Sequence, residues 1–191
     1  MHRWPMWLGL LLGLGAAYMG FALHQGIEDQ WSAATRYTAR VGFPVLILAY
    51  VARPLAEIGW SKWLLAKRRW IGLGFAMSHS VHLVCIFYLF QTLGETPPAV
   101  TLIFGGLAYA LLYAMAFTSN RGAMKALGAR WKTLHRIGIH YLWFIFAQSY
   151  LGRIFQDGKI EEGIIGATIA FGAAAIRFMA WRRRRRKVAP A

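Results

Sequence analysis

Histidines are the residues of this chain whose types and spacing best suit chemistry. The chain has six histidines, and two of them, His2 and His24, flank the first long apolar run. The other four lie within later apolar runs, as two pairs: His79 and His82, then His135 and His140. An ionisable side chain inside an apolar span is costly, so such histidines mark a candidate functional site.

The spacing within each pair fixes how the imidazoles lie on a helix. His79 and His82 are three residues apart, which places them on one face, about 60° and about 4.5 Å from each other. His135 and His140 differ by about 7.5 Å in height. Facing histidines from two membrane helices, without cysteine pairs, fit the axial ligands of a b-type haem. Two alternatives stay open, namely simple hydrogen bonding between helices and proton transfer or transport, although the apolar runs lack Asp and Glu partners.

The composition indicates the elements that hold these histidines. Hydrophobic residues make up 58% of the 191 residues, charged residues only 15%, and the mean hydropathy is +0.41. A soluble domain would be about a quarter charged, so we expect an integral membrane protein of one domain. A membrane helix needs about 20 apolar residues. The sequence therefore predicts an all-α bundle of six membrane helices, with a polar loop over 24–40, and the predicted spans are 4–23, 41–56, 70–90, 100–117, 133–151 and 164–181.

The charges predict the orientation of this bundle. All but four of the 22 Lys and Arg flank one set of span ends, and six of the seven acids flank the other. Because Lys and Arg accumulate on the cytoplasmic side, both termini are expected in the cytoplasm. Residues 1–181 form the predicted membrane domain and 182–191 a basic cytoplasmic tail against anionic lipid. The net charge of +15 is thus a topology signal, and no nucleic-acid partner is predicted.

Other cofactor motifs are absent from the sequence. Cys85 is the only cysteine, which excludes an intrachain disulfide and a CxxC metal site. The glycine-rich stretch over 8–16 lies inside the first membrane run rather than after a strand, so it is no dinucleotide fingerprint. Flavin or nicotinamide chemistry must therefore come from another protein.

Several short motifs lie within roughly residues 40–150. They are AYVARPL at 49–55, Arg68-Arg69-x-x-Gly72-Leu73 followed by His82, Thr118-Ser119, and Leu127-Gly128-x-x-Trp131-x-x-Leu134-His135-Arg136. In their order and spacing these motifs resemble those of the ferric-reductase-like transmembrane family, in particular the haem subunit of the bacterial periplasmic methionine-sulfoxide reductase system.

The resemblance implies a six-helix bundle with haem b in the bacterial inner membrane. Such a protein passes electrons from the quinone pool or a cytoplasmic flavin to a periplasmic reductase. His82 matches the family's haem ligand on the third helix, and His135 the first histidine of the fifth. The family's second histidine lies thirteen positions later, where this chain has Gln148. Arg68 and Arg69 are expected to anchor their helix or to pair with haem propionates or a quinone-side partner.

Gln148 leaves three outcomes open, because glutamine is a poor ligand for haem iron. The haem is five-coordinate on His82, or its ligands have moved to His79 and His140, or the haem is lost. The sequence therefore predicts a membrane haem b protein that acts as an electron-transfer subunit rather than a self-sufficient enzyme. Haem b is the expected cofactor, a quinone or FMN is a further candidate, and lipids and a periplasmic reductase subunit are the expected partners. The alternative is a haem-free scaffold or assembly subunit, and the candidate cofactor residues are His82, His79, His140 and His135.

Overall fold

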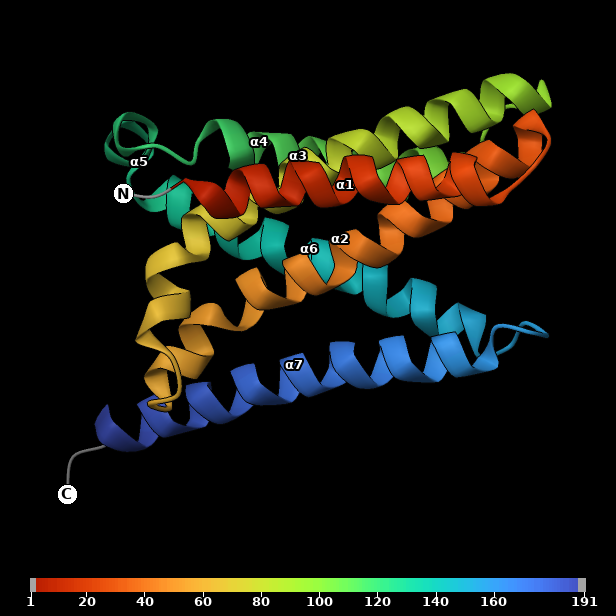
Figure 1. Ribbon diagram of the computed structural model, residues 1–191. Helices are drawn as coiled ribbons and strands as arrows, with labels where there is room; N and C mark the ends of the chain where they lie inside the picture. The colour runs from red at the N-terminus through yellow and green to blue at the C-terminus, as the bar shows by residue number, and fades with distance from the viewer. Residues whose placement is uncertain (1–2, 189–191) are drawn as a thin grey trace.

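The computed structural model describes residues 3–188, with side chains as far as Arg186. This part of the chain forms only helices, which confirms the all-α prediction (Figure 1). The elements are α1 (Trp4–Leu23), α2 (Ile27–Glu57), α3 (Lys62–Leu93), the π-helical segment η1 (Thr101–Gly105), α4 (Gly106–Phe117), α5 (Arg121–Leu127), α6 (Ala129–Arg153) and α7 (Ile160–Val188).

Several helices are long and apolar enough to cross a membrane. Four meet this condition by length and composition, namely α1, α2, α3 and α7. A fifth follows if the segment Thr101–Phe117 and α5, which meet at 107°, count as one broken span. By contrast, α6 has 25 residues but carries Arg130, Lys132, Arg136 and Arg153. The apolar helices support a membrane protein, while the count of six spans stays a prediction.

The predicted polar loop over 24–40 is wrong, because α2 begins at Ile27 and continues without a break to Glu57. Glu28 and Asp29 lie in its first turn, where their negative charges interact favourably with the helix dipole. Ala33 and Ala34 are fully buried, and the backbone of Ala34 lies against Gly20 of α1. The small residues let α1 and α2 pack closely, and this packing stabilises a helix in a stretch that is otherwise polar. This extension carries Thr38 into the bundle interior.

The other helices also continue beyond their apolar runs. Helix α3 begins eight residues before the predicted start at 70, where the Ser61 side chain caps it by accepting a hydrogen bond from the Leu64 amide. The stretch between the predicted spans 100–117 and 133–151 contains α5. Helix α7 runs past Trp181 to Val188, so residues 182–188 of the predicted tail are its last turns. The remainder of that tail, 189–191, lies outside the described residues.

The helices of the bundle pack in two different ways. Helices α1, α2 and α3 lie close together, and a side chain on Gly9 of α1 would overlap with the backbone of Gly74 on α3. The backbones of α3 and α6 stay farther apart and meet through aromatic side chains, with Phe75 and His79 on one side and Phe146 on the other. The interior between α3 and α6 is thus filled by large rings.

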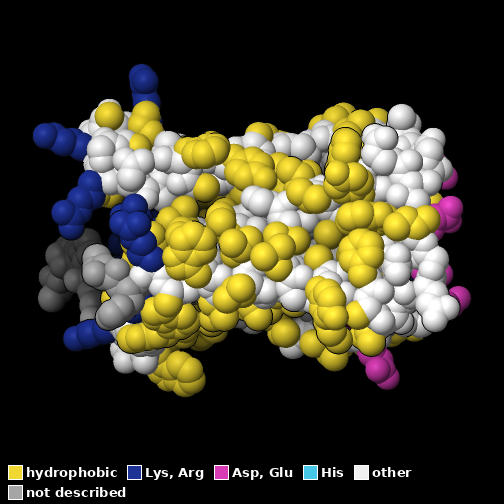
Figure 2. Space-filling view, turned by 45° about the horizontal axis from the view of Figure 1, so that its top comes forward, with side chains coloured by type: hydrophobic (Ala, Val, Ile, Leu, Met, Phe, Trp, Pro, Cys, Tyr) yellow, Lys and Arg dark blue, Asp and Glu magenta, His cyan; other side chains and the backbone are white. Residues whose placement is uncertain are grey.

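Charged side chains separate to the two ends of the bundle. Figure 2 shows Lys and Arg at one end, Asp and Glu at the other, and a broad apolar belt between them. We call these the cation end and the acid end. Helix α1 begins and α7 ends at the cation end (Figure 1). Cys85 is a free, buried thiol in the belt.

Candidate functional site

His82 is held by a hydrogen bond to the neighbouring helix α2. Its Nδ1 lies 2.9 Å from the hydroxyl oxygen of Thr38, a fully buried residue. Thr38 donates its only hydroxyl proton to the Ala34 carbonyl at 2.7 Å, so toward His82 it accepts. We therefore assign the proton to Nδ1 of His82, which leaves Nε2 with a free lone pair. A fixed tautomer of this kind is typical of a metal-ligating histidine.

His79 lies one turn before His82 and is buried among aromatic rings. The two imidazoles are 5.1 Å apart, and the rings of Phe75 and Phe146 lie at 4.3 and 5.4 Å. Its Nδ1 is buried without a hydrogen-bond partner among the described residues. Gly42 of α2 makes room for the ring, since a side chain there would overlap with the imidazole. An unpaired nitrogen in a packed interior is costly unless a ligand satisfies it.

On α6, Phe146 rather than Gln148 faces these histidines. Phe146 contacts His79 and lies 6.2 Å from the ring of Phe75. Gln148 is two residues later, about 200° around the helix. It is exposed, on the same side as Phe144 and Leu151. The position that replaces the expected histidine thus points away from α3.

His140 belongs to a different network, at the cation end. Its Nε2 accepts a hydrogen bond from the guanidinium of Arg177 at 3.2 Å, so the Nδ1–H faces the Tyr50 hydroxyl at 3.1 Å. The same guanidinium donates to the Tyr50 carbonyl and lies over the Tyr50 ring. These contacts join α2, α6 and α7. Both nitrogens of His140 are engaged, and the structure does not bring it to His79.

His135 repeats the arrangement of His82 at another place. The Thr118 hydroxyl donates to the Ala114 carbonyl and accepts from Nε2 of His135 at 3.2 Å. The imidazole packs on Trp131 at 4.2 Å. His135 therefore has a free Nδ1, but it lies at the cation end with His140.

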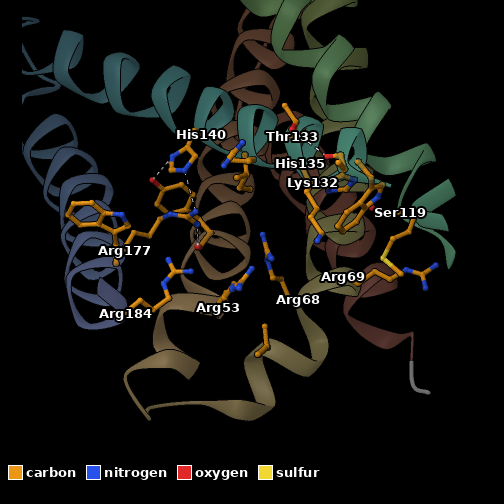
Figure 3. A pocket seen from close by; sticks show the side chains of 18 of the residues that line it. Arg53, Arg68, Arg69, Ser119, Lys132, Thr133, His135, His140, Arg177 and Arg184 are labelled. Atoms are coloured by element: carbon orange, nitrogen blue, oxygen red, sulfur yellow. Dashed lines mark hydrogen bonds between the residues drawn. The ribbon is translucent and has the colours of Figure 1, made fainter. Parts of the chain in front are cut away.

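A large basic cavity opens between α3, α6 and α7 at the cation end. Its volume is about 1270 Å³, and His135 and His140 are on its wall (Figure 3). In the described part of the chain, no Asp or Glu lines it. Eight cationic side chains do, namely Arg53, Arg68, Arg69, Arg121, Lys132, Arg136, Arg177 and Arg184.

The sequence predicted the His79 and His82 pair but not its surroundings. Thr38 was missed because it lies in the stretch expected as a loop, although Ala34 and Thr38 at helical spacing are a signal of a buried face. Phe146 was missed because one aromatic among many carries no specific signal. Among residues 3–186, no group of three or more His, Cys, Asp and Glu could hold a metal ion.

Comparisons with known proteins bear on this site. The chain is 28% identical to the protein-methionine-sulfoxide reductase heme-binding subunit MsrQ of Yersinia enterocolitica, over 78% of this chain and 85% of that protein. It is 29% identical to the proteins of the same name from Klebsiella pneumoniae and Cronobacter sakazakii, over 73% of this chain and 80% of each. The chain is related to the MsrQ haem-binding subunits.

The MsrQ relatives are described by name as haem-binding, so the residues here can be tested for that fit. His82 offers a bare Nε2, which suits haem iron. The unpaired Nδ1 of His79 packs against Gly42, where even a methyl group would overlap with the ring, so it does not offer the same room. His79 and His82 lie on one face of one helix, so they cannot occupy the two opposite axial positions of one iron. No family model matches the chain, and the ferric-reductase-like assignment stays a prediction. No solved structure matches it either.

Proposed function

We propose that this chain is a six-span protein of the bacterial inner membrane that binds haem b and passes electrons to a periplasmic reductase subunit. The hydrogen bond that His82 donates from Nδ1 to the Thr38 hydroxyl carries this proposal, since it leaves a bare Nε2 inside an apolar helix. The relatives support it, because their name describes a haem-binding subunit of a reductase. The segregated charges support cytoplasmic termini, with the cation end in the cytoplasm.

In this proposal His82 would hold the haem iron, and it would be the only ligand from this chain. His79 borders the same face of α3, and Phe146 covers the side of α6 from which a second ligand would come. His140 is not a ligand in this proposal, because both its nitrogens are hydrogen-bonded. His135 and Arg68 lie at the cation end, and Arg68 is about 21 Å along α3 from His82, too far to pair with a haem there.

Each part of the chain has a defined task in this electron transfer. Haem iron supplies the one-electron Fe(III)/Fe(II) couple when bound. Thr38 holds the His82 ring in the ligating tautomer, while Phe75 and Phe146 pack against the neighbouring ring of His79. The donor, a membrane quinol or a reduced cytoplasmic flavin such as FMNH2, approaches at the cation end. The acceptor docks at the acid end, where Glu28, Asp29 and Glu161 are exposed.

The visible spectrum of the purified protein tests the proposal. After expression with ample haem, the reduced protein should show an α absorption band at roughly 560 nm. The variant His82→Ala should abolish the band, while His140→Ala should leave it unchanged. A colourless wild-type protein would overturn the proposal, and loss of the band in His140→Ala alone would transfer the ligand role to the cation end.

One observation favours the second candidate, a haem-free scaffold that keeps this fold. The His79 ring already packs against Phe75, Tyr109 and Phe146, so side chains occupy the space between α3 and α6. In that case His79→Phe should stabilise the protein, because it removes an unpaired buried nitrogen. A haem protein should instead lose haem affinity or change its spectrum in this variant.

A further inference from the structure

The basic cavity has far more cationic charge than the protein neutralises. Within the described residues, carboxylates lie within 4 Å of only two of its eight cations, Arg53 and Arg184. Both of these pair with Glu57 alone. Six cations around one cavity therefore have no carboxylate partner among these residues. For the two that are half-buried, Arg68 and Arg177, this is costly unless an anion is bound.

Two of the unpaired cations lie deep in the wall and point in a fixed direction. Arg68 donates to the Ala49 carbonyl at 3.3 Å, and Arg177 donates to the Tyr50 carbonyl and to His140. These neutral acceptors orient each guanidinium but leave its charge in place. Figure 3 shows both side chains directed into the same space from α3 and α7. Planar guanidinium groups held in this way suit the oxygens of a phosphate.

The cavity also has an apolar wall. Leu65, Ile139, Phe178 and Trp181 line it along with the cations, and Leu65, Phe178 and Trp181 are also exposed on the outer surface. Trp181 lies on α7, and tryptophan is enriched where membrane helices meet the membrane–water interface. A ligand with a phosphate head and an apolar tail fits both walls.

We propose that this cavity binds the phosphate headgroup of an anionic phospholipid from the leaflet at the cation end. The headgroup oxygens pair with Arg68 and Arg177, and an acyl chain lies along Phe178 and Trp181. Basic pockets between membrane helices recognise lipid headgroups by this combination of charge and depth. The lipid site needs no haem, so it does not depend on the proposed haem binding at His82.

Native mass spectrometry of the full chain in neutral detergent tests the proposal. Phosphatidylglycerol should remain bound under conditions that remove phosphatidylcholine. The double variant Arg68→Gln/Arg177→Gln should weaken phosphatidylglycerol binding by about tenfold or more. Its matched control is Lys125→Gln/Arg130→Gln, which removes two exposed charges at the same end but outside the cavity, and it should change binding less than about twofold.

Further measurements distinguish the proposed lipid site from general attraction of anionic lipid to positive charge and from a site for soluble phosphate. Equal weakening in both double variants, or no preference over phosphatidylcholine, would overturn the proposal. Inorganic phosphate and pyrophosphate should not displace the lipid at millimolar concentration, and displacement by either would assign the site to a soluble phosphate. If Arg177→Gln impairs folding, Arg69→Gln/Arg136→Gln replaces it, since both are exposed cavity cations with no ion pair among the described residues.

Discussion

The hydroxyl oxygen of Thr38 lies 2.9 Å from Nδ1 of His82 and joins α2 to α3 inside the bundle. The donated proton of Thr38 is used by the Ala34 carbonyl, so the bond fixes which imidazole nitrogen is bare. The bond therefore prepares His82 to bind a metal, because a ligating histidine needs a free lone pair on a ring that is held in place.

Thr38→Val should therefore weaken haem binding while His82 remains. Valine keeps the shape but removes the acceptor, which leaves the Nδ1–H unsatisfied at a cost of about 1–3 kcal/mol. We expect haem affinity to fall about 10–100-fold, measured by haem retention in detergent. Thr38→Ser should restore it. The control is Thr118→Val, which removes the equivalent bond to His135, and an equal loss there would contradict the role of Thr38.

Gly42→Ala should disturb His79 directly. A methyl group there would overlap with Nδ1 and Cε1 of the His79 ring. Overpacking of this kind costs about 1–3 kcal/mol, so the midpoint of thermal unfolding should fall. Gly72→Ala is the matched control on α3, because nothing lies within 4 Å of its added Cβ, and it should be neutral or stabilising by up to about 1 kcal/mol. Unchanged stability of Gly42→Ala would place the His79 ring elsewhere.

Gln148→His should not add an iron ligand, although it introduces the histidine that the motif resemblance leads us to expect at this position. The position lies on the exposed side of α6, about 200° from the ring of Phe146 that contacts His79. The spin state of the iron, read from the visible and electron paramagnetic resonance spectra, should stay that of wild type. Phe146→His places an imidazole on the correct face and is the variant expected to change it. Conversion to a low-spin spectrum by Gln148→His would show that α6 is rotated.

The sequence predicted where helices lie better than which way they face. A long apolar run must be helical in a membrane, because no water satisfies its backbone. That rule says nothing about polar neighbours, so the first half of α2 and the start of α3 were missed. The His79 and His82 pair follows from spacing alone. The partners of His140 do not, since Tyr50 and Arg177 are 90 and 37 residues away. Matching a motif likewise singled out Gln148 by its position in the chain, but it did not predict that this residue lies on the exposed side of α6.

Glu162 tests how the acid end is held together. Its carboxylate accepts from Arg40 of α2 at 2.7 and 2.8 Å and from Arg153 of α6 at 2.8 Å. A bidentate bond plus a second arginine makes this stronger than a single surface pair, so Glu162→Gln should cost about 1 kcal/mol. Thermal unfolding in detergent should show a lower midpoint, and high salt should reduce the difference from wild type. The adjacent, exposed Glu161→Gln is the control, and if both variants unfolded alike, these ion pairs would not stabilise the contact of α7 with α2 and α6.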